Sequence, residues 1–206
     1  EMRKVRVLEQ RKAALIGEYA CQIQLGFPSA VVKDPSNDDV VVYLKALFEG
    51  ACPDVVYLHN PADKHDTHVA CCLRSIEALR GLPEEARPSM VYGCEVWRDL
   101  DWLADADKLV LPVHDRENLA AALTGVYDSQ ISGGKRYDLA VRGRRLANAT
   151  FHKNDEVDKY GALTFAIDLT PLVSDPSLDV ADYTLTLLRN TKDEITDRII
   201  RMKGPR

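Results

Sequence analysis

The sequence lacks several features that would place it in a specialised class of protein. No apolar run approaches the ~20 residues that a membrane-spanning helix needs, so we expect no membrane partner. The formal net charge of −5 leaves no basic footprint, so we expect no nucleic-acid partner. The first residues are charged rather than apolar, and we therefore expect a cytoplasmic protein without a signal peptide. Internal repeats and low-complexity segments are also missing.

The five cysteines include no Cys-x-x-Cys pair, which argues against a structural zinc site built from thiolates. Cys71 and Cys72 are adjacent inside an apolar stretch, and we expect reduced, buried thiols. What remains is an ordinary globular composition, with 46% hydrophobic and 29% charged residues. The 206 residues are enough for a sizeable core, and we expect a single domain over residues 1–206.

Short apolar segments alternate along the chain with longer helix-like segments. Strands are expected at residues 55–58, 90–96, 108–113 and 163–169, and helices at 2–25, 38–49, 67–79, 117–131, 137–151 and 182–202. This alternation predicts an α/β fold, a Rossmann-like three-layer sandwich around a mostly parallel sheet. In such sheets, functional sites form at the carboxyl ends of the strands.

The segment 59–68 holds three of the five histidines and two aspartates, directly after an expected strand and before an expected helix. His65 and His68 are three residues apart, so in the first turn of a helix they would project from neighbouring positions. Asp63 and Asp66 could orient these imidazoles through their second ring nitrogens. Two interpretations stay open on this pattern, a metal site and a helix cap within a loop.

The same segment resembles a known family. Residues 54–68 (DVVYLHNPADKHDTH) are similar to the second motif of the LmbE-like (PIG-L) family of zinc-dependent N-acetylglucosamine deacetylases, an aspartate-rich loop that ends in His-x-x-His. Residues 92–102 (YGCEVWRDLDW) resemble the branch in which such a domain follows a glucosamine-6-phosphate deaminase-like domain in one polypeptide. Residues 125–131 (GVYDSQI) and 134–138 (GKRYD) fit that branch too, and the resemblance covers residues 5–170.

The resemblance implies a zinc-dependent hydrolase that removes an acetyl group from an N-acetylglucosamine-type sugar, with or without a phosphate. His68 would be a zinc ligand, and His65 would stabilise the oxyanion or protonate the leaving amine. The expected partners are a small-molecule amino sugar, a deaminase-like domain of the same polypeptide and further copies of the chain in a homo-oligomer.

Several other side chains are candidates for substrate binding because they follow expected strands. Arg98 lies in the loop after residues 90–96, and His114 follows residues 108–113, where it could line the same cleft. His59 could contact a ligand or cap the loop. Arg142 and Arg145, with their neighbour Arg144, suit either a sugar phosphate or a solvated basic face.

One departure from the family pattern bears on activity. The family's first motif, His-Pro-Asp-Asp, supplies the other metal ligands and the general base, and it does not occur in these 206 residues. The chain opens with Glu1 and runs directly into a helix-like stretch, so we expect that the first strand is missing and that this chain alone binds zinc weakly and is inactive. The alternatives are a non-catalytic sugar-binding or regulatory module attached to an amino-sugar enzyme, and a structural oligomerisation domain.

Overall fold

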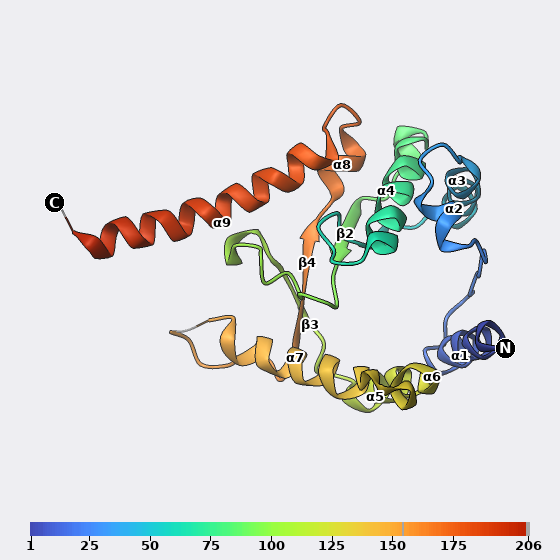
Figure 1. The fold of residues 1–206 in the computed structure, drawn as a ribbon, viewed down its shortest axis with the longest axis horizontal. Coiled ribbons are helices and arrows are strands. Elements are labelled where there is room, and N and C mark those ends of the chain that lie inside the picture. The colour runs from blue at the N-terminus through green and yellow to red at the C-terminus, as the bar shows by residue number, and fades with distance from the viewer. Residues whose placement is uncertain (154, 205–206) are drawn as a thin grey trace. The chain divides into compact units, whose positions relative to one another are not determined.

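A computed structural model describes residues 1–153 and 155–204, and it has the mixed α/β architecture expected from the sequence (Figure 1). The chain forms two compact units. Unit 1 comprises Glu1–Gly26 and Leu111–Thr164, and unit 2 comprises Phe27–Val110 and Phe165–Arg206. Within the described ranges, no helix combines the length and the apolar character that a membrane crossing requires.

The four strands of the sheet are β1 (Val55–His59), β2 (Met90–Cys94), β3 (Leu109–Pro112) and β4 (Leu163–Asp168), in the spatial order β1-β2-β4-β3. All four lie within one or two residues of the expected positions. Strands β1 and β2 run parallel, with His59 opposite Cys94. Strands β2 and β4 run antiparallel, with Tyr92 opposite Asp168.

The sheet direction corrects one expectation. The α/β class is confirmed, but a mostly parallel Rossmann-like sheet is wrong, because β4 pairs antiparallel with β2. The segment from β1 through the following helix to β2 forms the parallel unit that the alternation predicted. A strand that is buried on both faces gives a continuous apolar run in either direction, so this pattern does not report strand direction.

The helices of unit 2 are α2 (Ser29–Lys33), α3 (Asp39–Ala51), α4 (Asp66–Arg80), α8 (Thr170–Ser174) and α9 (Val180–Lys203), with single 3-10 turns at Glu84–Ala86 and Asp105–Asp107. Helix α4 connects the two parallel strands and packs on β1, while its other neighbours are α2, α3 and α8. Its buried side chains recur at the three- and four-residue spacing of one helix face, which is why this segment forms the centre of the unit.

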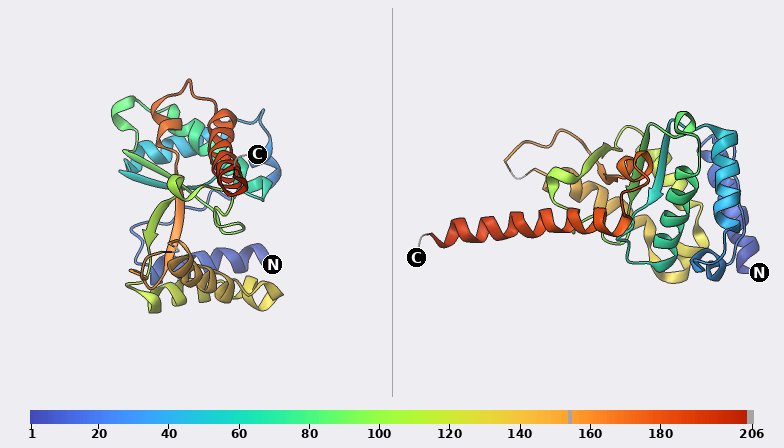
Figure 2. Two further views of the ribbon diagram at one scale, coloured as in Figure 1. Left: turned by 90° about the vertical axis from the view of Figure 1, so that its left-hand side faces the viewer. Right: turned by 90° about the horizontal axis from the view of Figure 1, so that it is seen from above.

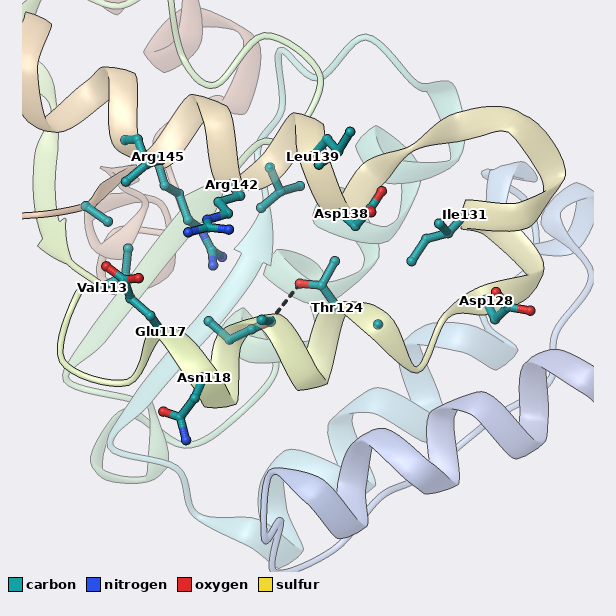
Figure 3. A pocket seen from close by; sticks show the side chains of 16 residues that line it. Val113, Glu117, Asn118, Thr124, Asp128, Ile131, Asp138, Leu139, Arg142 and Arg145 are labelled. Atoms are coloured by element: carbon teal, nitrogen blue, oxygen red, sulfur yellow. Dashed lines mark hydrogen bonds between the residues drawn. The ribbon is translucent and has the colours of Figure 1, made fainter.

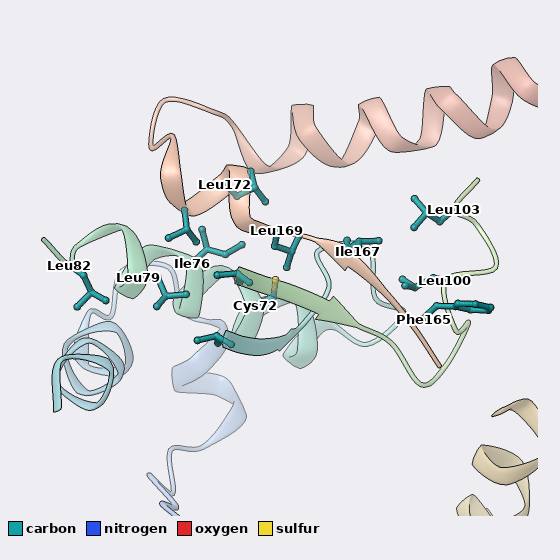
Figure 4. Packing of buried hydrophobic residues seen from close by; sticks show 13 residues of the cluster. Cys72, Ile76, Leu79, Leu82, Leu100, Leu103, Phe165, Ile167, Leu169 and Leu172 are labelled. Atoms are coloured by element: carbon teal, nitrogen blue, oxygen red, sulfur yellow. The ribbon is translucent and has the colours of Figure 1, made fainter. Parts of the chain in front are cut away.

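The hydrophobic core of unit 2 lies between α4, the strands and α8 (Figure 4). Its fully buried side chains include Ile76, Leu79 and Leu172, which are at most 1% exposed. Arg80 ties α4 to α8 and to the loop after α8, because its guanidinium donates to the carbonyl oxygens of Leu172 at 2.5 Å and Leu178 at 2.6 Å. Charge-assisted bonds of this kind stabilise a fold by about 1.5–3 kcal/mol each.

Gly93 in β2 is a position where only hydrogen fits. A Cβ atom added there would lie 2.8 Å from Cδ1 of Leu169, 3.0 Å from Cγ1 of Ile167 and 3.2 Å from Cβ of Asn60. The first two side chains belong to the hydrophobic core, and the third belongs to the loop after β1. The absence of a side chain at Gly93 therefore lets the β1 loop approach β2.

We expect Gly93→Ala to destabilise the protein by about 1–3 kcal/mol, because the added methyl group overpacks a closed core. Gly143→Ala is the matched control. Gly143 lies inside α7 (Tyr137–Phe151) with nothing within 4 Å of an added Cβ, so the same substitution there should stabilise by roughly 0.5–1 kcal/mol. Urea unfolding of both variants measures the difference. Equal effects of the two substitutions would show that the close packing around Gly93 is not as described.

Unit 1 consists of α1 (Met2–Ile16), α5 (Glu117–Gly125), α6 (Asp128–Gln130), a π-turn at Ile131–Lys135 and α7. Helix α1 packs against α5 and α6, and α5 packs against α7. The buried carboxylate of Glu9 joins α1 to the start of α6, since it accepts both the backbone N–H and the hydroxyl of Ser129 at 2.7 Å.

Two expected helices are shorter than their apolar spacing indicated. Helix α1 ends at residue 16 instead of 25, because Glu18 adopts a left-handed conformation (φ 50°) and the N–H of Tyr19 returns to the carbonyl of Ala14 at 2.9 Å. The segment 117–131 is likewise interrupted after Gly125. In both cases the apolar pattern continues past the point where the backbone turns.

The cysteines are all free. Cys72 is completely buried in the core, and this burial raises the pKa of its thiol to about 12. Cys21 and Cys52 are exposed, so the expectation of buried thiols is wrong for these two, which lie outside the packed face of any helix.

Candidate metal centre

Three side chains that could hold a metal ion lie close together between the end of β1 and the first turn of α4. His59 is the last residue of β1, Asp63 lies in the connecting loop, and His68 is the third residue of α4. One ligand atom from each of them lies within 4.8 Å of the others. The cluster therefore sits at the carboxyl end of a strand, where the sequence predicted a site.

Asp63 is the fixed point of this cluster, because its side chain has no exposed surface. One carboxylate oxygen (Oδ1) accepts the backbone N–H of His65 at 2.8 Å, and the other (Oδ2) lies 3.0 Å from Nδ1 of His68. With Nδ1 donating to this carboxylate, His68 keeps the lone pair of Nε2 for a metal ion. Of the two aspartates that could orient an imidazole, Asp63 is thus the one that contacts the ring of His68.

His59 lies flat against His68, with ring centroids 4.0 Å apart and an interplanar angle of 2°. Desolvation of the His59 ring, followed by the repulsion from His68, lowers its pKa, although Asp63 acts in the opposite direction. The neutral imidazole that this environment favours is the form that binds metals.

The stacked arrangement of His59 and His68 prevents both rings from coordinating one metal ion at the same time. Lone pairs of imidazole nitrogens lie in the ring plane, so two parallel rings direct them within two separate parallel planes, and the lone pairs do not meet at one ion. Coordination by both rings therefore requires one of them to rotate. Asp63 holds His68, whereas His59 is exposed at the end of its strand, so His59 is the ring that would turn.

His65 caps α4 and also faces the cluster. Its Nδ1 accepts the N–H of Thr67 at 3.3 Å, which makes it the N-cap of the helix. Its ring centroid lies 4.7 Å from that of His68 at an interplanar angle of 26°. The two interpretations of the His-x-x-His pattern are therefore compatible, because the Nδ1 edge of His65 serves the cap and Nε2 lies on the other edge of the ring.

The loop that carries the cluster is held by hydrogen bonds between the backbone of Ala62 and the side chains of Asn60 and Arg98. Asn60 is completely buried, and its Oδ1 accepts the N–H of Ala62 at 2.8 Å. The carbonyl of Ala62 accepts a hydrogen bond from Nη1 of Arg98 at 3.3 Å. Arg98, which we expected to bind substrate, is thus attached to the same loop that presents Asp63, while substrate contact stays a prediction.

Glu95 is an acidic residue near this edge that the sequence analysis did not single out. It follows Cys94, the residue opposite His59 in the parallel pair, so the sheet places it at the same end as the cluster. Glu95 is 4% exposed, and its Oε2 accepts the indole N–H of Trp102 at 3.3 Å. Its Oε1 is buried without a hydrogen-bond partner among the described residues. In the sequence, its position as an acidic residue at the end of the second expected strand could have identified it as a candidate.

His114 lies just after β3 and belongs to unit 1, so its expected place in the substrate cleft stays a prediction. Its Nε2 lies 3.2 Å from Oδ1 of Asp115, and its ring is 5.5 Å from that of Tyr160. Its Nδ1 is buried without a hydrogen-bond partner among the described residues.

A cavity of about 640 Å³ lies within unit 1, between α5 and α7 (Figure 3). Arg142 and Arg145 extend from α7 into it, and Glu117 lines it from α5. Thr124 is also part of its wall and is bonded to the carbonyl of Ala120 at 2.9 Å. Two of the three arginines that we noted in the sequence therefore line a cavity, together with carboxylates as well as apolar side chains.

Comparisons with known proteins indicate the fold. No family model matches the chain, and no curated protein matches it either. The crystal structure of the conserved protein TT1542 from Thermus thermophilus is similar, with a TM-score of 0.63 at 19% sequence identity. The similarity covers 85% of this chain and 78% of that chain. It supports the α/β architecture, and at this identity it speaks for the fold alone.

Proposed function

We propose that the protein is a zinc-dependent N-deacetylase that acts on an N-acetylglucosamine-type sugar, with the loop 59–68 as its metal-binding segment. The observation that carries this proposal is the buried contact between Asp63 and Nδ1 of His68, which leaves the Nε2 of a fixed imidazole available as a ligand. The resemblance of the same loop to the second motif of LmbE-like deacetylases supports the choice of reaction and substrate.

The donor set suits zinc in its chemistry. Neutral imidazole nitrogen and carboxylate oxygen are among the usual zinc ligands, and catalytic zinc sites take three protein ligands and a water. His68 would be the ligand in this assignment and Asp63 its orienting partner, and His59 would be a second imidazole ligand if its ring rotated. When bound, a zinc ion polarises the amide carbonyl and lowers the pKa of a coordinated water.

We assign the other roles in the reaction, proton donation or oxyanion binding and substrate contact, to His65 and Arg98. His65 stands next to His68 with its Nδ1 edge occupied by the helix cap, so its Nε2 is the atom placed to hydrogen-bond the oxyanion or to give a proton to the leaving amine. Arg98 donates to the carbonyl of Ala62 in this loop, and we assign contact with the sugar to it. Both assignments use only the geometry around one loop.

Release of acetate tests the proposal. The full-length protein, loaded with zinc, should release acetate from N-acetylglucosamine or its 6-phosphate, and removal of the metal with a chelator should abolish the release. Acetate release should be measured with each of the two sugars under the same conditions, because the difference in rate shows whether the substrate needs a phosphate. Sugar binding without any acetate release by the zinc-loaded protein would contradict the proposal and favour a non-catalytic sugar-binding module.

A further inference from the structure

Helix α9 has two faces of different kinds. Its first half packs on the core of its own unit, where Tyr183 and Leu187 contact the core residues. The hydroxyl of Thr191 also donates to the carbonyl of Trp102 at 2.9 Å. The C-terminal part of the helix runs clear of the other elements of unit 2 (Figures 1 and 2). The face that meets the core thus accounts for only part of the helix.

A second row of apolar side chains follows α9 on a different face. Its members recur at alternating intervals of three and four residues, and they are exposed: Leu185 (47%), Leu188 (38%), Ile195 (49%), Ile199 (50%) and Met202 (72%), with Lys192 at the one polar position of the row. We call this row the α9 seam. An apolar repeat with a mean interval of 3.5 residues is typical of a helix that packs lengthwise against another helix.

We propose that the α9 seam pairs, in antiparallel orientation, with the α9 seam of a second copy of this chain. In this arrangement Leu185 faces Met202 of the second copy, and Leu188 faces Ile199. Lys192 faces Ile195 across the two-fold axis. Every apolar member of the seam then meets an apolar side chain or the aliphatic stem of the lysine, as a self-complementary interface requires.

Charge selects the antiparallel orientation. In a parallel pair the two copies of Lys192 would face each other inside the interface, and Arg198 would lie beside Lys203 of the second copy. Such contacts between like charges cost several kcal/mol. In the antiparallel pair, Arg189 and Arg198 instead flank neutral threonines of the second copy. The arginine and lysine residues beside the seam therefore favour the antiparallel orientation of the second α9 over the parallel one.

The oligomeric state of the full-length protein and of two lysine variants tests this pairing. We expect a dimer by sedimentation velocity, and we expect Ile195→Lys to raise the dimer dissociation constant by at least about tenfold. Ile200→Lys is the matched control, because Ile200 is 63% exposed on the same stretch of α9 but lies off the seam. Its dimer should persist. A monomeric wild type at concentrations up to about 100 µM, or equal weakening by both substitutions, would overturn the proposal.

The orientation has its own readout. A nitroxide carried by an unnatural amino acid at position 202 should give an inter-label distance of about 25 Å or more, because residues 185 and 202 are separated by that length of helix at 1.5 Å per residue. A distance of about 10 Å, the spacing of adjacent helices, would show parallel pairing and contradict the proposed arrangement.

Discussion

Replacement of His68 by alanine is expected to abolish stoichiometric zinc binding by the full-length protein. Asp63 fixes this imidazole through Nδ1 at 3.0 Å, so His68 is the ring whose Nε2 is available without any rearrangement. Metal content after dialysis, measured by mass spectrometry, gives the occupancy. Asp63→Asn should weaken zinc binding by about 10- to 100-fold while leaving the ligand itself in place, as is usual for a partner that orients an imidazole.

The control is a histidine outside the cluster. His152→Ala changes an imidazole at the end of α7 in unit 1, and zinc occupancy should stay unchanged. Zinc retained at full occupancy in the His68→Ala variant would remove the ligand assignment, and with it the role that we give to Asp63.

The second large effect is expected at His65. His65→Ala should keep zinc and lower turnover on the order of 100-fold or more, the usual consequence of removing one oxyanion donor. The side chain also caps α4 through its contact with the N–H of Thr67, so the alanine variant loses stability as well. Acetate release and urea unfolding, measured on the same preparation, report the two effects separately.

His65→Asn distinguishes the cap from the chemistry. Asparagine is a good N-cap residue, so this variant should recover stability relative to alanine while turnover stays low, because an amide does not transfer a proton as imidazole does. Recovery of turnover together with stability would show that His65 does not give a proton to the leaving amine, because an asparagine amide can replace a helix cap or a hydrogen-bond donor but not an acid.

The positions of the strands could be predicted from the sequence, but their directions could not. The apolar runs around Val56, Val91 and Phe165 identify β1, β2 and β4, because buried strands need apolar side chains whatever their direction. The direction of β4 depends on where the chain re-enters the sheet after the helices of unit 1. That path is set by tertiary packing, and no local pattern in residues 163–168 carries it.

The candidate site was predictable to the extent that it is local. The loop 59–68 contains the cluster, and the sequence offered Asp63 and Asp66 as partners that could orient its imidazoles. The positions of two further residues near the site, His59 and Glu95, depend on the fold and could not be predicted from the loop alone. His59 stacks on His68 only because the loop folds back over the end of β1, and Glu95 reaches this edge only because β2 pairs parallel with β1.

Crystals of the full-length protein grown with zinc, with diffraction data collected at the zinc absorption edge, test the central claim most directly. We expect an anomalous peak about 2.0–2.1 Å from Nε2 of His68, with the His59 ring rotated out of its parallel stack and the Asp63 contact intact. A zinc peak elsewhere in the protein, with the His59–His68 stack unchanged, would contradict the account.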